Sequence, residues 1–434
     1  MNLLHANDRP GRYPPSLYAA ARPLPAPSAP LTGALRADVC VIGGGYTGLS
    51  AALHLARRGY DVCLLEAQRL GFGASGRNGG QVGSGQRMDQ RDLERLAGPD
   101  DARLLWQLAE DAKAEVRALI ADHAIACDWR DGVAHLARSP QAAAHEAALA
   151  DHLARHYGYT ATEILDRDDA ARETGARGFS GGVIDWGAGH LDPLAFVLGL
   201  AGAAREAGAR LHECSEATSL ARDGAHHVVT TAQGRVTADT LVLACNGYLG
   251  RLHGPTAARV MPINNFIVAT DPLHAFPGVL PRGIAAADDK FVVNYWRRSA
   301  DDRLVFGGGE TYGYRFPADI AAMVRPLMER LYPQLAGIGI AHAWGGTLAI
   351  TRSRLPHFAQ PEPGLYTASG YSGHGVALAT LAGRLIAEAV DGDAARFALM
   401  SRLPAPAFPG GPALRNPLLV LAMTWFALRD RLGF

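Results

Sequence analysis

The sequence contains very little lysine, which narrows the chemistry open to it. Of its 42 basic residues only Lys113 and Lys290 are lysines, and the others are arginines. Catalysis through a Schiff base or pyridoxal phosphate needs a lysine amine, so few positions are available for it. The 42 acidic residues balance the basic ones, and the formal net charge at pH 7 is +0. No overall charge attracts nucleic acid, which is therefore not an expected partner.

Cysteine pairs, metal-binding motifs and long apolar runs are also missing. The five cysteines form no CxxC motif and the 16 histidines show no HExxH spacing, so no metal is expected. This cysteine usage and the lack of a secretory signal at the N-terminus predict a cytoplasmic protein. No apolar run reaches the roughly 18 residues of a membrane helix. The nearest to it, residues 417–428, is predicted to be a helix docked on the protein body, and membrane contact is not expected.

Glycine, by contrast, is abundant, and the most informative glycines lie in VCVIGGGYTGLSAALHLARRGYDVCLLEA, residues 39–67. The run predicts a strand, a glycine turn, a helix and a second strand that ends in an acid. Gly43 permits the tight turn, Gly45 lets the backbone approach a pyrophosphate, and Gly48 lets the helix pack on the sheet. Glu66 lies 18 residues after Gly48, where a carboxylate can accept hydrogen bonds from ribose hydroxyls. The pattern predicts a dinucleotide site; the alternative is a purely structural glycine turn.

A second glycine turn, GYSGHG at residues 370–375, lies between a short predicted strand and a helix whose apolar stripe includes Leu378, Leu381 and Leu385. It follows the first turn by more than 300 residues. Two such turns suit a long dinucleotide held at both ends, and FAD is such a ligand. A helix N-terminus at the flavin would stabilise the negative charge that collects on the reduced ring. The alternative is a strand and helix that only complete the sheet.

The chain is long enough for two domains, because 434 residues exceed what one simple core usually holds. We expect an α/β fold in which a Rossmann-like FAD-binding domain is interleaved with an α+β substrate domain built on an antiparallel sheet. The FAD-binding domain is predicted at residues 36–92, 175–250 and 345–395, and the substrate domain at 93–174 and 251–344. Residues 1–35, rich in proline and alanine, predict an extended arm that lies over the fold or is partly disordered. Residues 396–434 are expected to form a C-terminal tail and helix.

Several stretches carry a resemblance to a known family. They are GGGYTGLSAALHLA, LEAQRLGFGASGRNGGQ, ACNGYLG, WGGTLAITRSRLPHF and GYSGHGVALATLAGRLIAEA. Together they resemble the FAD-dependent amine and D-amino-acid oxidoreductases, which include glycine oxidase and sarcosine oxidase. The resemblance covers nearly the whole chain. It implies an FAD enzyme that oxidises a CH–NH2 or CH–NH group of a small amine, with oxygen or another electron acceptor.

The resemblance also implies which residues contact the cofactor. In the first glycine motif these are Gly43, Gly45, Gly48 and Glu66. In the loop that follows they are Ser75, Arg77, Asn78, Gly79 and Gly80, with the Arg77 cation serving phosphate or ring oxygens. Asn246 and Gly247 follow a strand that ends at the cofactor. The pyrimidine side of the flavin would be contacted by Gly370, Tyr371, Ser372, Gly373, His374 and Gly375.

Three departures from the family pattern refine the expected chemistry. Sarcosine oxidases of the family tether the flavin through a cysteine at the position of Leu348, so the FAD is expected to be non-covalent here. They hold a small substrate carboxylate with a lysine where Ala377 stands, which disfavours a carboxylate directly beside the flavin. The lysine that promotes their reaction with oxygen corresponds to Val305, so oxidase and dehydrogenase behaviour both stay open.

The resemblance implies an enzyme that oxidises the primary amine of γ-glutamylputrescine, or of a similar acylated polyamine, to an aldehyde. A D-amino-acid or N-methyl-amino-acid oxidoreductase is the alternative, and a non-catalytic flavin-binding protein is an alternative of another class. No catalytic residue is assigned, and His190 is interpreted as structural. The candidates for lining the substrate site are Tyr295, Trp296, Trp344, Arg354 and Tyr371, with Arg354 or Arg297 pairing with a distal carboxylate.

Overall fold

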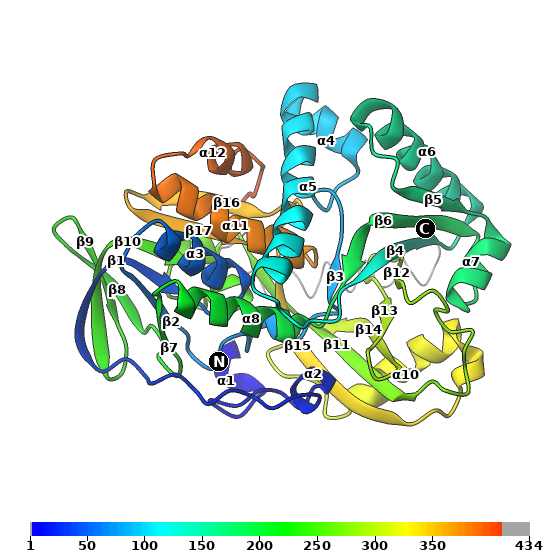
Figure 1. The fold of residues 1–434 in the computed structure, drawn as a ribbon, viewed down its shortest axis with the longest axis horizontal. Helices are drawn as coiled ribbons and strands as arrows, with labels where there is room; N and C mark the ends of the chain where they lie inside the picture. The colour runs from blue at the N-terminus through cyan, green and yellow to red at the C-terminus, as the bar shows by residue number, and fades with distance from the viewer. Residues whose placement is uncertain (1, 410–434) are drawn as a thin grey trace.

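The fold was obtained as a computed structural model, which describes residues 2–409. Two β-sheets lie side by side, each accompanied by helices, and the long helix α5 stands between them (Figure 1). The helices are α1 (Leu3–Ala6), α2 (Leu17–Ala20), α3 (Tyr46–Arg57), α4 (Gln90–Ala97), α5 (Pro99–Asp122), α6 (Pro140–Tyr157), α7 (Arg167–Thr174), α8 (Pro193–Glu206), α9 (Gly254–Ala257), α10 (Ile320–Leu331), α11 (Gly375–Val390) and α12 (Ala395–Ser401). Among these residues, no helix is both long and apolar enough to cross a membrane.

The first sheet carries both glycine turns. Its strands are β1 (Gly33–Ile42), β2 (Val62–Leu65), β7 (Arg210–His212), β8 (Ser219–Asp223), β9 (His226–Thr230), β10 (Gly234–Leu243), β16 (His357–Glu362) and β17 (Leu365–Ser369). Along β17, β10, β1, β2 and β7 the neighbours pair in parallel, while β16, β9 and β8 add antiparallel edges. The inner halves of β1 and β2 are wholly buried. Parallel strands covered on both faces are expected to be continuously apolar, and these are.

The second sheet is mostly antiparallel. It comprises β3 (Gln81–Val82), β4 (Arg130–Ala137), β5 (Thr162–Leu165), β6 (Gly181–His190), β11 (Met261–Pro272), β12 (Ala285–Asp288), β13 (Tyr295–Arg298), β14 (Arg303–Thr311) and β15 (Ile340–Ile350). The strand order is β15-β11-β14-β13-β12-β4-β6-β3, and only β12 and β4 run parallel. Helix α10 packs against β11, β14 and β15, and Trp296 lies fully buried in the core beneath it.

The chain crosses between the sheets more often than the predicted domain ranges allow. Strand β6 pairs with β4 and β5 in the second sheet, although residues 175–250 were expected in the first domain. Strand β15 likewise extends the second sheet into residues assigned to the first. Helix α5 packs against α11 beside the first sheet, whereas residues 93–174 were expected in the substrate domain. Pairing partners decide sheet membership, and composition along the chain does not reveal them.

The N-terminal residues are ordered on the protein surface and are not simply extended. They contain α1 and α2, and Ser16 caps α2 by accepting a hydrogen bond from the N–H of Ala19 at 3.2 Å. The buried Tyr18 donates to the carbonyl of Asn78 at 2.9 Å and meets Trp344 edge-on at 5.2 Å. The arm therefore supports the loop that follows the first glycine motif. The helix predicted at residues 417–428 lies outside the described residues.

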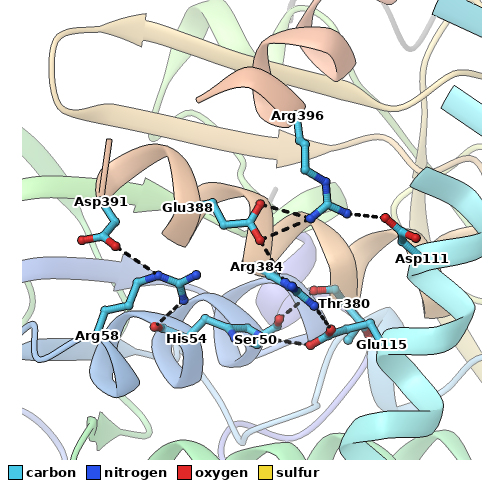
Figure 2. A network of polar contacts seen from close by, with 10 residues as sticks. All are labelled: Ser50, His54, Arg58, Asp111, Glu115, Thr380, Arg384, Glu388, Asp391 and Arg396. Atoms are coloured by element: carbon cyan, nitrogen blue, oxygen red, sulfur yellow. Dashed lines mark hydrogen bonds and ion pairs between the residues drawn. The ribbon is translucent and has the colours of Figure 1, made fainter. Parts of the chain in front are cut away.

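Helix α11 is anchored at its C-terminal half by a network of charges (Figure 2). Arg384 pairs with Glu115 of α5 at 2.6 Å and with Glu388 at 2.9 Å. His54 of α3 bonds the same Glu115 at 2.8 Å, and Arg396 of α12 reaches Glu388 at 3.3 Å. Burial opposes the ionisation of Glu115, but the bonds from His54 and Arg384 prevail and lower its pKa to about 2. The network joins α3, α5, α11 and α12.

Candidate active site

Two adjoining cavities lie where the sheets meet. The larger, of about 880 Å³, borders the first glycine turn, and the smaller, of about 290 Å³, reaches the second sheet. Five residues line both, so the cavities form one extended site: Gly45, Ala74, Ser75, Ala244 and Asn246. The extended site runs from the carboxyl ends of the parallel strands to strands β13 and β14. A ligand that fills it must be long.

The first glycine motif builds one wall of the larger cavity. Gly43 has φ +110°, and a Cβ there would lie 2.6 Å from the carbonyl oxygen of Ala244. A Cβ on Gly48 would collide with the carbonyl oxygen of Gly43, so this glycine brings α3 close to the turn and does not itself line the cavity. Helix α3 begins after Gly45 with no side-chain cap. Its first N–H groups and its positive dipole end suit a phosphate.

Glu66 is buried in the wall of the larger cavity. Its Oε2 accepts the N–H of Gly44 at 2.7 Å, and its Oε1 accepts the N–H of Gln68 at 2.8 Å. Burial raises the pKa of Glu66 to about 7 in spite of these two bonds. The carboxylate therefore holds the glycine turn through the N–H of Gly44, and its remaining lone pairs can accept further hydrogen bonds.

The second glycine turn lines the smaller cavity with Tyr371, Ser372, Gly373, His374 and Gly375. The hydroxyls of Tyr371 and Thr47 lie 2.6 Å apart, which ties the start of α11 to the start of α3. Gly370 does not line the cavity; its N–H donates to Oδ1 of Asn246 at 2.9 Å and so fixes the turn. Asn246 lines both cavities and Gly247 the larger one.

His374 occupies the N-cap position of α11 and makes no side-chain capping bond. Burial, reinforced by the nearby Arg87 cation, lowers the pKa of His374 to about 4, so the ring is neutral at neutral pH. Its Nε2 is buried and, within residues 2–409, has no hydrogen-bond partner. A buried polar atom of this kind normally has one. Nε2 is therefore the ring atom that lacks a polar partner in the described chain.

The loop after Glu66 only partly fits its predicted role. Ser75, Asn78 and Gly79 line the smaller cavity, but Arg77 and Gly80 line neither. The buried Arg77 donates to the carbonyls of Phe72 at 2.6 Å and Gly345 at 3.1 Å and pairs with Asp8 at 2.8 Å. Its Nη2 is buried and has no hydrogen-bond partner within residues 2–409, so the predicted contact of the Arg77 cation with the cofactor stays a prediction. Gly80 has φ +80° and closely approaches the carbonyl of Leu191, so its role is conformational.

Of the five substrate-lining candidates, the structure brings three together. Tyr295, Arg354 and Tyr371 line the smaller cavity. Trp296 and Trp344 do not, and their prediction is wrong. Successive side chains of a strand point to opposite faces, so Tyr295 in β13 faces the cavity while Trp296 stacks on Phe306 in the core, with ring centroids 5.6 Å apart. Trp344 donates through Nε1 to the carbonyl of Arg77 at 3.0 Å.

Two further predictions concern residues outside the cavity. Arg297 is buried and donates to the carbonyl of Gly79 at 2.9 Å, so it supports the loop and is not placed to meet a ligand. His190 is buried as well, and its Nε2 lies 2.8 Å from the carbonyl oxygen of Gly283. Burial lowers the pKa of His190 to about 3, which agrees with the structural role predicted for it.

Sequence reasoning missed several polar residues that line the smaller cavity. Arg87, His135, Asp288 and Glu310 all line it together with Phe291. Arg87 follows a second glycine-rich stretch, and Glu310 follows three consecutive glycines, Gly307 to Gly309. Glycines that precede an isolated charge are the one signal in the sequence that pointed to these positions. No local pattern shows that they share a cavity.

Comparison with known proteins decides the family. The model of the DAO family, described as FAD dependent oxidoreductase, matches residues 38–389. The chain belongs to this family. The cofactor is therefore FAD, the protein is an FAD-dependent oxidoreductase, and the predicted combination of a Rossmann-like FAD domain with a substrate domain is confirmed.

Two relatives match the chain over nearly its whole length. Probable oxidoreductase OrdL of Rhizobium meliloti is 43% identical over 408 residues, covering 92% of this chain and 94% of the relative. Gamma-glutamylputrescine oxidoreductase of Escherichia coli is 39% identical over 421 residues, covering 96% of this chain and 98% of the relative. The similarity extends beyond the cofactor motifs to the whole of both folds.

Solved structures share the same fold. Glycine oxidase from Geobacillus kaustophilus superimposes with a TM-score of 0.72 at 24% identity, over 82% of this chain and 95% of that one. L-proline dehydrogenase from P. horikoshii gives a TM-score of 0.69 at 19% identity, over 84% and 94%. At these identities the likeness establishes the fold alone.

The residues of the extended site fit FAD on their own chemistry. Helices α3 and α11 each begin at the site without a side-chain cap, and helix starts of this kind attract a pyrophosphate and an electron-rich ring. A Cβ on Gly45 would lie 2.8 Å from Oγ of Ser75, so glycine keeps the passage between the two cavities open. Nε2 of His374 has no hydrogen-bond partner among the described residues, and a polar atom of the cofactor would satisfy it.

Proposed function

We propose that the protein oxidises the primary amine of γ-glutamylputrescine, or of a similar acylated polyamine, to an aldehyde. The observation that carries the proposal is the 39% identity to gamma-glutamylputrescine oxidoreductase of Escherichia coli, which extends over 96% of this chain. The lining of the smaller cavity supports it, because aromatic and apolar residues line this cavity together with the charged side chains of Arg87, Glu310 and Arg354. An amine that also carries charged groups matches that lining.

In this proposal the residues of the larger cavity bind the adenosine and pyrophosphate. The start of α3 receives the pyrophosphate, and Glu66 accepts hydrogen bonds from the ribose hydroxyls. Ser75, Asn78 and Gly79 run along the flavin, and the start of α11 faces its pyrimidine side. Leu348 lines the smaller cavity where a tethering cysteine would stand, so the FAD is held without a covalent bond there.

The amine end of the substrate lies among Tyr295, Tyr371, Leu348 and Ile350, which line the cavity near the turns. The chemistry that bound FAD would supply is the acceptance of two electrons, as a hydride equivalent, from the carbon next to nitrogen; the imine would then be hydrolysed by water to the aldehyde and ammonia. Desolvation by these side chains disfavours the ammonium form, so the amine reaches the flavin neutral without a dedicated base. The pKa of His374, about 4, keeps a second cation out of this region.

A test uses the FAD-loaded protein without oxygen. It is mixed separately with γ-glutamylputrescine, putrescine, sarcosine and D-alanine, and the visible absorbance of the flavin is followed. Rapid bleaching by γ-glutamylputrescine, and much slower bleaching by the other three, is the expected result. Bleaching by an amino acid alone would contradict the proposal, and bleaching by none of the four would indicate a flavin protein without this activity. Admitting oxygen afterwards and timing the return of absorbance shows whether oxygen is the electron acceptor.

A further inference from the structure

The two carboxylates of the smaller cavity differ in how far the protein satisfies them. Asp288 accepts the backbone N–H of Asn294 at 2.8 Å and its side-chain Nδ2 at 2.6 Å, and Lys290 lies 4.0 Å away. Glu310 accepts only the hydroxyl of Tyr312, at 3.1 Å, in the described part of the chain. No cation of residues 2–409 comes within 4.0 Å of Glu310. Its carboxylate therefore has lone pairs directed to a ligand.

Two arginines in the same cavity also have N–H groups without a protein acceptor among the described residues. Arg87 donates through Nε to the carbonyl of Ser372 at 3.2 Å, and its other nitrogens have no protein acceptor among the described residues. The guanidinium of Arg354 lies over the ring of Phe291, 4.4 Å from its centre, which leaves the N–H edges clear. Burial raises the pKa of Glu310, while Arg354 and Arg87 oppose that rise. The three charges are thus close enough to interact, yet they are not joined as ion pairs.

The backbone at both arginines is held in an unfavourable conformation. Arg87 has φ +65° and Arg354 has φ +66°, in the left-handed region that costs an L-residue about 1–2 kcal/mol. Nine non-glycine residues of the described chain have positive φ, and four of them line this extended site: Arg87, Asn246, Arg354 and Ser372. Strain of this kind persists where the surrounding fold fixes a functional geometry. Here it fixes two cations in the lining of one cavity.

We propose that Arg87, Arg354 and Glu310 bind the α-amino-acid head of a γ-glutamyl amine. The two guanidinium groups pair with the α-carboxylate, and the carboxylate of Glu310 accepts hydrogen bonds from the α-ammonium. This assignment rests on the proposed function, because the amine at the other end of the same ligand is the one that meets the flavin. Each charge of the head then has an opposite charge as its partner, and the site selects the head group.

Two analogues separate the two charges of the head. Glutarylputrescine keeps the carboxylate and lacks the α-ammonium, whereas 4-aminobutanoylputrescine keeps the ammonium and lacks the carboxylate. Glutarylputrescine leaves Glu310 without its ligand partner, and 4-aminobutanoylputrescine leaves Arg87 and Arg354 without theirs. We expect each analogue to require about 10- to 100-fold higher concentration than γ-glutamylputrescine for half-maximal flavin reduction, with a similar limiting rate.

Binding is also measured without oxidation of the terminal amine, using γ-glutamylbutylamide, which carries the same head and lacks that amine. Calorimetric titration of the FAD-loaded protein should detect it, and the Arg354→Gln, Arg87→Gln and Glu310→Gln variants should each bind it about tenfold or more weakly. Arg354→Lys should regain part of the lost affinity. Arg352→Gln is the matched control, because Arg352 is an exposed neighbour that does not line the cavity. It should bind like the unaltered protein.

The outcomes separate this inference from the proposed function. If γ-glutamylputrescine reduces the flavin but both analogues do so at equal concentrations, the head-group site is wrong and the function stands. If γ-glutamylbutylamide binds and γ-glutamylputrescine does not reduce the flavin, the function is wrong and the site stands. Should a variant fail to retain FAD, the analogue comparison on the unaltered protein still decides. Equal binding by Arg354→Gln and Arg352→Gln would also overturn the inference.

Discussion

Helix α11 lies between two groups of arginine and carboxylate side chains, of which one is joined by ion pairs and the other is not. At its C-terminal half, Arg384 and Glu388 belong to a network in which every charge has a partner on α3, α5 or α12 (Figure 2). At its N-terminal end, Arg87, Arg354 and Glu310 share a cavity without forming an ion pair among the described residues. The first group joins helices, and the second is available to a ligand.

The difference follows from what each group leaves unsatisfied. A buried charge with a partner contributes to one fixed arrangement, although its desolvation cancels much of the attraction. A half-buried charge without a partner, such as that of Glu310 or Arg354, costs some stability until a ligand supplies the partner. Substitutions should therefore affect the two groups in opposite directions. The paired carboxylate should matter for stability, and the unpaired one for binding.

The largest effect is expected when the paired network is broken at Glu115. Glu115→Gln removes the charge with which both His54 and Arg384 pair. The free energy of unfolding should fall by about 2–4 kcal/mol. The loss is smaller than for a fully buried pair because the side chain of Arg384 is 40% exposed. The pKa of Glu115, about 2, lies below its usual value of 4.5. Its contribution is therefore complete above pH 4.5 and is lost as the pH falls toward 2.

Denaturant unfolding of the FAD-loaded protein measures this loss at pH 7 and at pH 4. The control is Asp151→Asn, which breaks the surface pair with Arg155 on α6, whose side chains are 65% and 70% exposed. That control should change stability by no more than about 0.5 kcal/mol. A loss for Glu115→Gln as small as the control would show that the network does not stabilise the fold. Binding of γ-glutamylbutylamide should be unchanged in both variants.

The sequence predicted the parts of the site that depend on local structure. Gly43, Gly45 and Glu66 lie within one strand, turn, helix and strand, and the geometry of that unit places them at one cavity. Trp296 was assigned wrongly beside Tyr295 because neighbouring strand residues face opposite sides, and the sequence does not say which side is the cavity. The composition of the chain likewise did not show which sheet a strand joins. Strand β6, which was expected in the first domain, pairs in the second sheet.

The unpaired charges were missed for a different reason. Arg87 and Glu310 are more than 200 residues apart in the chain, and only the pairing of the second sheet brings them to one cavity. Arg77 illustrates the converse. Its motif predicted a cofactor contact, and nothing in the sequence indicated that Asp8 of the N-terminal arm pairs with it at 2.8 Å while its Nη2 has no partner in the described residues. Such distant partners determine whether a charge is available to a ligand.

Glu66 is an intermediate case that sharpens the comparison, because it has two backbone donors and no cation within 4.0 Å in the described chain. Its pKa of about 7 means that it is partly protonated at neutral pH. Ribose hydroxyls donate to the ionised form, so the affinity of the apoprotein for FAD should fall as the pH drops below 7, by up to about tenfold per pH unit. Glu66→Gln should bind FAD about 5- to 100-fold more weakly at pH 8.

Fluorescence titration of the apoprotein with FAD between pH 6 and pH 8 checks both expectations. In Glu66→Gln the affinity should vary little with pH, because the titrating group is gone. A pH slope as steep as that of the unaltered protein would mean that another group titrates on binding, and Glu66 would then not be the ribose acceptor.

The smallest change in the free energy of unfolding is expected for substitution of Glu310, and its sign is opposite to that for Glu115. Burial raises the pKa of Glu310, so the folded state disfavours the ionised carboxylate, and this cost grows as the pH rises above the ordinary value near 4.5. Glu310→Gln should therefore raise the free energy of unfolding at pH 8 by up to about 1 kcal/mol, and change it less at pH 5. Denaturant unfolding without substrate at both pH values measures the difference. A loss of stability in Glu310→Gln as large as that in Glu115→Gln would show that Glu310 is a structural partner of Arg87 or Arg354, since a carboxylate reserved for a ligand contributes to binding and not to folding.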